Sequence, residues 1–177
     1  MENEELIRRA RDGDRDAFVT LMRQNEEALH HMAWSMLRKN EDVADAMQET
    51  VLKAYRSISS LREPNYFRTW MFRILINECN TLLRGRKRTV SVADFPITAS
   101  SANDYDRVDL RDAVDRLEEK QRTVVILHYF EDLSVAQTAQ TLELTESAVK
   151  TRLMRARAAL MQKFKSNPKG SMHYESV

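Results

Sequence analysis

Residues that form tight turns are scarce in this sequence, which has only three Gly and three Pro among its 177 residues. A sheet of several strands needs many such turns, whereas nine Met with frequent Leu, Ala, Glu and Arg favour helix. We therefore predict an all-α fold. Hydrophobic residues make up 42% and charged residues 31%, which is enough to bury a core under a charged surface, in one domain or two small ones.

The sequence offers little for disulfide, metal or membrane chemistry. The single cysteine, Cys79, cannot form an internal disulfide and provides no cluster of metal ligands. The charged start, Met1 to Arg15, lacks the apolar centre of a signal peptide, and no run approaches roughly 18 consecutive apolar residues. We expect a soluble, cytoplasmic protein with no metal, no cofactor and no segment inserted in a membrane.

A segment without helical periodicity, Thr89 to Asp106, separates two strongly helical regions and is typical of a linker. Four helices are predicted before it: Asn3 to Arg11, Arg15 to Leu37, Glu41 to Ile58, and Tyr66 to Arg84. Four are predicted after it: one marked by Leu110, Val114 and Leu117, then Lys120 to Tyr129, Ser134 to Leu142, and Thr145 to Phe164. This organisation predicts two small helical domains, 1–88 and 107–167, joined by a flexible linker at 89–106 and followed by a tail at 168–177.

Charge is unevenly distributed along the chain although the formal net charge is only +1. Residues 1–88 carry 16 basic and 14 acidic side chains, residues 89–133 carry 5 and 10, and residues 134–177 carry 7 and 3. A uniformly basic nucleic-acid coat is therefore excluded. Two basic clusters flank the acidic middle, and each could bind phosphate or form a solvated helix end. The clusters are Arg84, Arg86, Lys87, Arg88 and Lys150, Arg152, Arg155, Arg157.

The last two predicted helices have helix-turn-helix spacing. Ser134 is a natural N-cap, Leu142-Glu143-Leu144 interrupts the helical period, and Thr145 caps the second helix. Glu143 is unusual because this turn often has Gly or Asn, where φ can be positive. The second helix turns Val149, Leu153, Ala156 and Leu160 inward and leaves Lys150, Thr151, Met154 and Arg155 on its outer side. In a major groove that side contacts base edges and phosphates, while an ordinary helical hairpin is the alternative.

Residues 66–88, YFRTWMFRILINECNTLLRGRKR, combine aromatic, amide and basic side chains. Aromatics interleaved with cations suit unstacked bases, although Phe67, Trp70 and Phe72 could in part be core residues. On a helix, four polar side chains share a face that the apolar Met71, Ile74, Leu75 and Leu82 do not dominate. These polar side chains are Arg73, Asn77, Asn80 and Arg84.

Catalysis finds little support in the residues. Glu27-x-x-His30 has the spacing of a di-iron ligand pair in a helical bundle, but a second such pair is required and none is present. Only Gly13, Gly85 and Gly170 are available for a nucleotide-binding glycine motif, and no such motif occurs. We expect a protein that is not an enzyme.

Three motifs together resemble the extracytoplasmic-function (group IV) sigma factors of the sigma-70 family of bacterial RNA polymerase. They are DAMQETVLKAYRSI at 45–58, FRTWMFRILIN at 67–77, and DLSVAQTAQTLELTESAVKTRLMRARAAL at 132–160. The resemblance covers about residues 10–165 and implies a region 2-like domain, a linker and a region 4-like helix-turn-helix domain. Two departures bear on promoter sequence: Thr145-Glu146-Ser147 stands where relatives often have Pro-x-Gly, and the loop from Ser57 to Asn65 is individual to this chain.

The resemblance implies a set of partners and binding residues. The core polymerase, through its β′ clamp helices and β flap, and promoter DNA are the expected partners, and an anti-sigma factor is the expected regulator. Residues implied for core polymerase binding are Asp45, Gln48, Glu49, Leu52 and Lys53. Residues implied for −10 DNA binding are Arg62, Asn65, Tyr66, Arg68, Trp70, Arg73, Asn77, Asn80, Arg84, Arg86, Lys87 and Arg88. Residues implied for −35 DNA binding are Ser147, Lys150, Thr151, Arg152, Met154, Arg155 and Arg157, with Arg152 and Arg157 on phosphates or in packing.

Two other functions also fit part of the sequence. An autonomous helix-turn-helix regulator, dimeric on a palindromic site and with residues 1–88 as a helical sensor, explains the C-terminal half equally well. It does not explain the aromatic and basic pattern from Tyr66 to Arg88. A helical adaptor that binds only proteins leaves both basic clusters unexplained.

Overall fold

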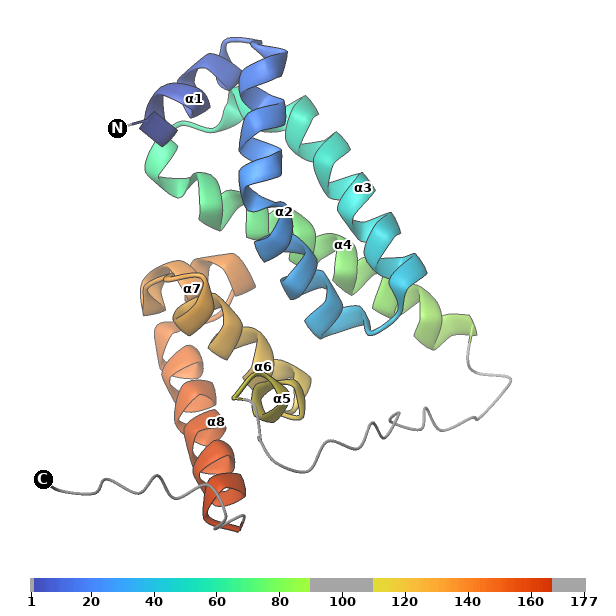
Figure 1. The fold of residues 1–177 in the computed structure, drawn as a ribbon, viewed down its shortest axis with the longest axis vertical. Helices are drawn as coiled ribbons and strands as arrows, with labels where there is room; N and C mark the ends of the chain where they lie inside the picture. Colours follow the sequence, from blue (N-terminus) through green and yellow to red (C-terminus); the bar gives the residue numbers. More distant parts are fainter. Residues whose placement is uncertain (1, 90–109, 167–177) are drawn as a thin grey trace, which may run out of the picture.

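The computed structural model describes residues 2–89 and 110–166, and within these ranges helices joined by short turns and loops are present and strands are absent. An N-terminal bundle contains the four longer helices of the first half and two short 3-10 turns, and a C-terminal unit contains the remaining helices (Figure 1). The bundle comprises α1 (Glu2–Arg11), α2 (Arg15–Leu37), α3 (Asn40–Ser57), η1 (Ile58–Ser60), η2 (Pro64–Tyr66) and α4 (Phe67–Thr89). The C-terminal unit comprises α5 (Leu110–Asp115), α6 (Glu119–Val125), the π-helical turn η4 (Ile126–Phe130), α7 (Val135–Leu142) and α8 (Glu146–Ser166). The all-α prediction is confirmed.

Local signals in the sequence fix several helix ends. Gly13 has a positive φ of 98°, and the Asp14 side chain then accepts hydrogen bonds from the backbone N–H groups of Asp16 and Ala17, both at 3.0 Å. Asp14 thereby caps α2, which spans the predicted range. Ser134 caps α7 in a reciprocal capping box with Gln137.

The predicted boundary of α4 is wrong at its C-terminal end, because the helix continues beyond Arg84 to Thr89. Gly85 lies inside the helix and a Cβ there would meet nothing within 4 Å, so this glycine serves no close packing. A glycine within an exposed helix costs about 1 kcal/mol relative to alanine, which a long packed helix tolerates. Most of the predicted linker at 89–106 lies outside the described residues.

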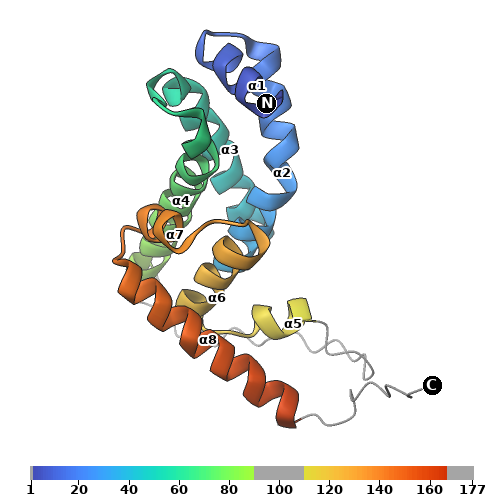
Figure 2. The same ribbon diagram turned by 90° about the vertical axis from the view of Figure 1, so that its left-hand side faces the viewer.

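Apolar side chains from both parts of the described chain form one contiguous buried cluster. In the bundle, Met32, Met71, Phe72 and Leu75 have no exposed surface, and in the C-terminal unit the same is true of Val124, Ile126, Leu127 and Val149. The two parts touch because α7 packs against α4 and α6 packs against α2 (Figure 2). Among the residues that the structure describes, no helix combines the length and hydrophobicity needed to cross a lipid bilayer.

Candidate nucleic-acid interfaces

The helix α4 has two faces of opposite character. Met71, Phe72, Leu75 and Cys79 are fully buried on one of them. Burial also raises the pKa of the Cys79 thiol to about 12. On the other face Arg73, Asn77 and Arg84 are exposed and Asn80 is half-buried. The predicted polar face therefore lies at the surface, where amide and guanidinium groups can donate hydrogen bonds.

The aromatic residues at the start of α4 divide between core and surface. Phe67 and Phe72 are buried, whereas Trp70 is half-buried with its ring centroid 5.9 Å from that of Phe67. Tyr66 is 48% exposed at the end of η2, beside the exposed side chains of Asn65 and Arg62. Tyr66 and the outer part of Trp70 are therefore the aromatic surfaces that an unstacked base can reach.

Two arginines of α4 are held by carboxylates of the C-terminal unit. Arg68 Nη2 lies 2.6 Å from Glu131 Oε2, and Arg73 Nη2 lies 2.5 Å from Glu143 Oε1. Glu131 is only 5% exposed, and its burial raises the pKa of the carboxyl group, an effect that the charge of Arg68 opposes. Neither pairing follows from the sequence, because each joins residues more than 60 positions apart.

The basic end of α4 is partly engaged within the bundle. Arg86 is half-buried, forms an ion pair with Asp42 of α3, and donates a hydrogen bond to the Leu37 carbonyl at 3.3 Å. Arg84 remains exposed. Lys87 and Arg88 belong to α4, but their side chains lie outside the described ones. Among the described side chains of the basic cluster 84–88, that of Arg84 is therefore the one that a phosphate can reach.

The face of α3 predicted to bind polymerase combines charge with exposed apolar surface. Asp45, Gln48, Leu52 and Lys53 are exposed, and Glu49 is half-buried. Lys53 Nζ forms an ion pair with Glu78 of α4 at 2.7 Å.

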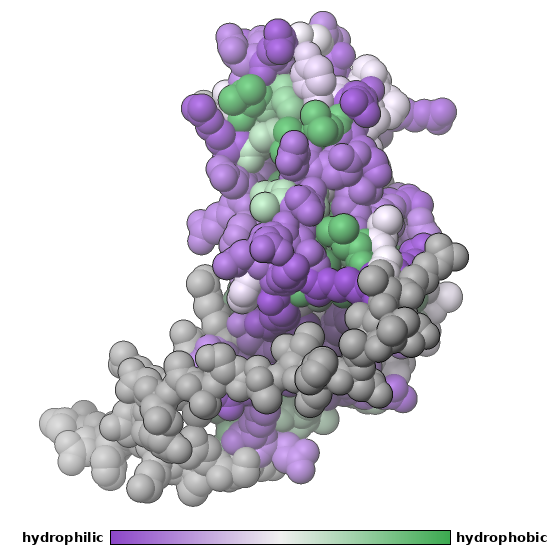
Figure 3. Space-filling model, turned by 90° about the vertical axis from the view of Figure 1, so that its right-hand side faces the viewer, coloured by the Kyte–Doolittle hydropathy of each residue, from purple (hydrophilic) through white to green (hydrophobic). Residues whose placement is uncertain are grey.

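One further apolar residue, Tyr55, adds to this face and was missed by the sequence reasoning. Tyr55 is 48% exposed and lies three residues after Leu52, which is 41% exposed, on the same helix. Figure 3, which views the molecule from its α3 side, shows hydrophobic residues exposed among hydrophilic ones. An exposed Tyr in a helical bundle gives no distinct sequence signal, because apolar residues with the same helical spacing also occupy buried positions.

The C-terminal pair of helices forms the predicted helix-turn-helix. Glu143 adopts the left-handed conformation with φ 55°, so glutamate occupies the position where glycine or asparagine is usual. The backbone N–H of Leu144 donates to the Ala139 carbonyl at 2.9 Å, and Thr145 Oγ1 accepts from the backbone N–H of Ala148 at 3.2 Å. These bonds end α7 and cap α8.

The outer face of α8 is open at the positions predicted to read DNA. Lys150, Arg155 and Ser147 are exposed, and Met154 is 62% exposed although it is a large apolar side chain. Lys150 lies 3.7 Å from Glu146 in an exposed i,i+4 pair, which contributes little energy. Thr151 is half-buried and donates its hydroxyl to the Ser147 carbonyl at 2.9 Å. Val149, Leu153 and Ala156 are buried on the opposite face, as predicted, and Leu160 is half-buried.

The two further arginines of α8 differ from their neighbours. Arg157 Nε donates to the Tyr129 hydroxyl at 2.7 Å, and its guanidinium lies 5.6 Å from the centroid of the same ring. Arg152 is half-buried. Arg157 therefore packs on η4 through its contact with Tyr129.

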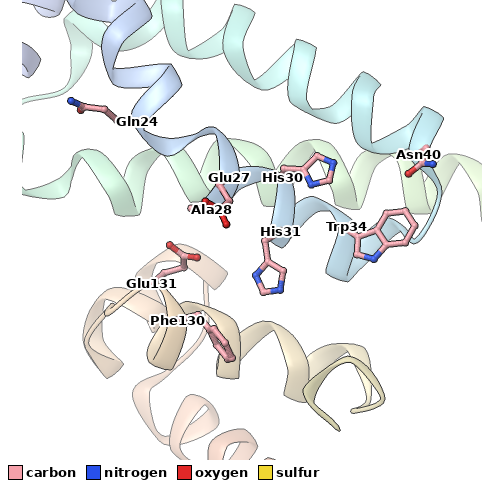
Figure 4. A pocket seen from close by; sticks show the side chains of 9 residues that line it. All are labelled: Gln24, Glu27, Ala28, His30, His31, Trp34, Asn40, Phe130 and Glu131. Atoms are coloured by element: carbon pink, nitrogen blue, oxygen red, sulfur yellow. The ribbon is translucent and has the colours of Figure 1, made fainter. Parts of the chain in front are cut away.

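A pocket lies where α2 faces η4 (Figure 4). It is lined by Gln24, Glu27, Ala28, His30, His31, Trp34, Asn40, Phe130 and Glu131. The ring centroids of His31 and Phe130 are 5.9 Å apart across the junction. Within the described residues, no three His, Cys, Asp or Glu side chains are grouped so that they could hold a metal ion. Among the described residues, the fold therefore does not bring together enough side chains to complete a metal site around Glu27 and His30.

Comparison with known proteins relates both helical parts of the chain to one family. The family model for sigma-70 region 2 matches residues 21–89, and that for sigma-70 region 4 matches residues 107–160. The chain is 35% identical over 161 residues to the ECF RNA polymerase sigma factor SigM of Mycobacterium tuberculosis, covering 89% of this chain and 82% of that protein. It is 30% identical over 141 residues to the RNA polymerase sigma factor SigV of Bacillus subtilis, covering 78% and 85%.

Solved structures give the same result for the fold. The sigma factor RpoE of Bartonella quintana, solved in complex with the anti-sigma factor NepR, matches with a TM-score of 0.70 and 27% identity over 84% of this chain and 96% of that chain. CnrH, solved in complex with the cytosolic domain of CnrY, matches with a TM-score of 0.67 and 26% identity over 93% and 98%.

The two matched regions define a sigma-70-type initiation factor, in which one helical domain and one helix-turn-helix domain act on a polymerase and its promoter. Within that class, the chain belongs to the extracytoplasmic-function sigma factors and is an alternative sigma factor of RNA polymerase. The autonomous dimeric regulator is not favoured.

Proposed function

We propose that this sigma factor divides promoter recognition between α4 and α8 while α3 binds the polymerase. The supporting observation is that one chain presents two exposed polar faces of different chemistry. The face of α4 combines amides, guanidinium groups and nearby aromatic surface, whereas that of α8 combines lysine, arginine and an exposed methionine. The first set suits unstacked bases and the second suits the edges of a duplex major groove.

In the −10 element, the region from Arg62 to Arg88 captures the non-template strand. Tyr66 and Trp70 offer stacking surface, and Asn77 and Asn80 offer hydrogen bonds to base edges. Opening the duplex costs a few kcal/mol for each flipped base. Binding energy from two DNA elements and from a large polymerase surface offsets that cost, so the protein itself performs no bond chemistry and is not an enzyme.

In the −35 element, Lys150 and Arg155 contact base edges and phosphates from α8, and Met154 contributes apolar contact. Met154 is 62% exposed, so its side chain is accessible for such a contact. Arg152 and Arg157 contribute phosphate contacts or packing. We propose domains at 1–88 and 107–167, with one DNA-binding surface in each.

The polymerase surface is proposed for α3, where Asp45, Gln48, Glu49, Leu52 and Lys53 meet the β′ clamp helices. Exposed Leu52 and Tyr55 supply the apolar part of that contact. The region 4-like domain binds the β flap. Since two structural relatives were solved in complexes, one with an anti-sigma factor and one with a cytosolic domain, we also propose a cytoplasmic location and an anti-sigma regulator for this chain.

Site-specific photocrosslinking in the holoenzyme tests these roles separately. A photoreactive amino acid replaces Leu52, Tyr66 or Met154 in turn, and the assembled complex is illuminated on promoter DNA obtained by transcription selection. Expected products link position 52 to β′, position 66 to the −10 non-template strand, and position 154 to the −35 duplex. A matched probe at the exposed Ala158 of α8 controls for nonspecific capture. Crosslinking of position 52 to DNA, or of position 66 to the −35 duplex, would contradict the proposed division.

A further inference from the structure

The contact between the two parts of the molecule covers a segment of the α4 surface. Figure 2 shows α7 lying beside α4, and the two helices pack against each other. Any DNA strand that follows the same side of α4 needs the volume that α7 occupies. The described arrangement is therefore one in which α4 is not fully available to DNA.

Three ion pairs across this contact share one polarity. In each of them an arginine of the N-terminal bundle meets a carboxylate of the C-terminal unit: Arg68 with Glu131 at 2.6 Å, Arg73 with Glu143 at 2.5 Å, and Arg38 with Asp115 at 3.0 Å. Two of the three arginines belong to the proposed −10 surface. Two of the three carboxylates, Asp115 and Glu131, come from the acidic segment 89–133, and Glu143 comes from the turn between α7 and α8.

We propose that Glu131 and Glu143 act as an intramolecular substitute for DNA phosphate, occupying Arg68 and Arg73 and holding the chain closed until promoter or polymerase separates its two parts. This proposal rests on the proposed function in one respect, namely that α4 binds DNA. Carboxylate and phosphate oxygens both accept short charge-assisted bonds from guanidinium, so the two acceptors compete for the same donors.

The energetics favour a contact that can open. The Arg73–Glu143 pair is exposed on both sides, with 45% and 63% of the side-chain surfaces accessible, so it adds only a small stabilisation. The Glu131 side chain is buried, with only 6% of its surface exposed. The charge of Arg68 compensates part of the cost of removing the Glu131 carboxylate from water. When the parts separate, Glu131 regains water while Arg68 gains phosphate, so neither charge is left buried and unpaired.

An interdomain distance measurement tests the closed contact without relying on DNA. Spin labels on Ser59→Cys of the bundle and Ala158→Cys of α8 report the separation, since both sites are exposed and the native Cys79 is buried. The key variant is Glu131→Gln with Glu143→Gln. Its control, Glu118→Gln with Glu119→Gln, makes the same charge change at exposed sites at the start of α6.

In the wild type and the control, the two spin labels should show a single distribution of short distances. In the key variant, a second population of molecules with a longer distance between the labels should appear. Glu143→Lys, at an exposed position, serves as a second variant that places like charge against Arg73 and should lengthen the distance further. Unchanged distances in both variants, with melting temperatures showing folded protein, would overturn the proposal.

A binding measurement tests the competition. The probe is a fluorescein-labelled single strand of about 20 nucleotides of mixed sequence, titrated with each full-length variant. The key variant should bind about threefold to tenfold more tightly than the wild type and the control. Longer distances without any gain in affinity would overturn the competition between carboxylate and phosphate.

Failure of the proposed function gives a different pattern. In that case holoenzyme carrying Asn77→Ala with Arg84→Ala would bind −10 single strand as tightly as wild-type holoenzyme. The distance measurement would still decide whether Glu131 and Glu143 hold the chain closed.

Discussion

The basic surfaces of α4 and α8 have similar composition but differ in what their cations contact. On α4, Arg68, Arg73 and Arg86 each form an ion pair with a carboxylate of another helix or turn. On α8, Lys150 meets only its neighbour Glu146, and Arg155 is exposed without an ion pair to any residue that the structure describes. On the proposed function, Lys150 and Arg155 can meet a duplex directly, whereas Arg68, Arg73 and Arg86 must first exchange their carboxylate partners. Composition alone therefore does not tell which of two basic clusters is available.

The largest expected effect concerns the buried face that supports α4. Phe72→Ala removes a fully buried ring and should lower the free energy of unfolding by about 3–5 kcal/mol. Asn77→Ala, on the exposed face of the same helix, should change it by less than about 0.5 kcal/mol. Urea denaturation followed by circular dichroism measures both. Equal losses in the two variants would contradict the assignment of the two faces.

The next effect concerns the α8 surface. Replacing Lys150 and Arg155 by Ala should weaken −35 recognition by about 1–3 kcal/mol for each base-specific interaction that the substitution removes. The measurement compares holoenzyme binding to duplexes with a native and a scrambled −35 element. Retained discrimination by a folded double variant would remove these residues from the recognition site.

A similar loss restricted to single-stranded DNA is expected at the N-terminal end of α4. Tyr66→Ala should weaken holoenzyme binding to the −10 non-template strand by about 1–3 kcal/mol, because one stacking surface is removed. Binding to the −35 duplex should stay unchanged, which separates the two surfaces. Tyr129→Ala is a matched control, since Tyr129 is exposed to a similar extent, 47% against 48%, but lies on η4. An equal loss on both DNAs for Tyr66→Ala would show that its role is structural.

The smallest effect distinguishes packing from DNA binding on α8. Arg157→Ala should lower the free energy of unfolding by about 0.5–1 kcal/mol, because it removes the hydrogen bond and the cation–π interaction with Tyr129. The salt dependence of −35 binding should not change. If the slope of the logarithm of affinity against the logarithm of salt concentration became smaller in magnitude by about one, Arg157 would instead be shown to bind a phosphate.

The sequence predicted the helices well where local signals were strong. The predicted limits of α2, Arg15 to Leu37, match the structure because Asp14 caps the start and the apolar periodicity persists to the end. The turn at Glu143 was placed correctly although glutamate is uncommon there, since the change of period on either side fixes its position. The predicted end of α4 at Arg84 was wrong, because the helix continues through Gly85 to Thr89.

The candidate sites were predictable as faces but not as pairings. Periodicity placed Arg73, Asn77 and Arg84 on the surface, and the family resemblance supplied their proposed role. The sequence could not reveal that Glu131 is buried against Arg68, because that pairing depends on how the N-terminal bundle and the C-terminal unit pack together. Arg157 was expected on phosphates or in packing, and the fold supplies Tyr129 as its packing partner.

The central claim is that this chain directs polymerase to promoters by using two DNA surfaces. In vitro transcription of a genomic fragment library by purified core RNA polymerase, with and without the protein, tests it most directly through the 5′ ends of the transcripts. The account predicts new start sites that share two upstream motifs. Tyr66→Ala should weaken the dependence of transcription on the −10 motif, and Lys150→Ala with Arg155→Ala should weaken its dependence on the −35 motif. If no new starts appeared while the chain alone retained particular duplex fragments, the claim would be contradicted and an autonomous regulator would explain the helix-turn-helix.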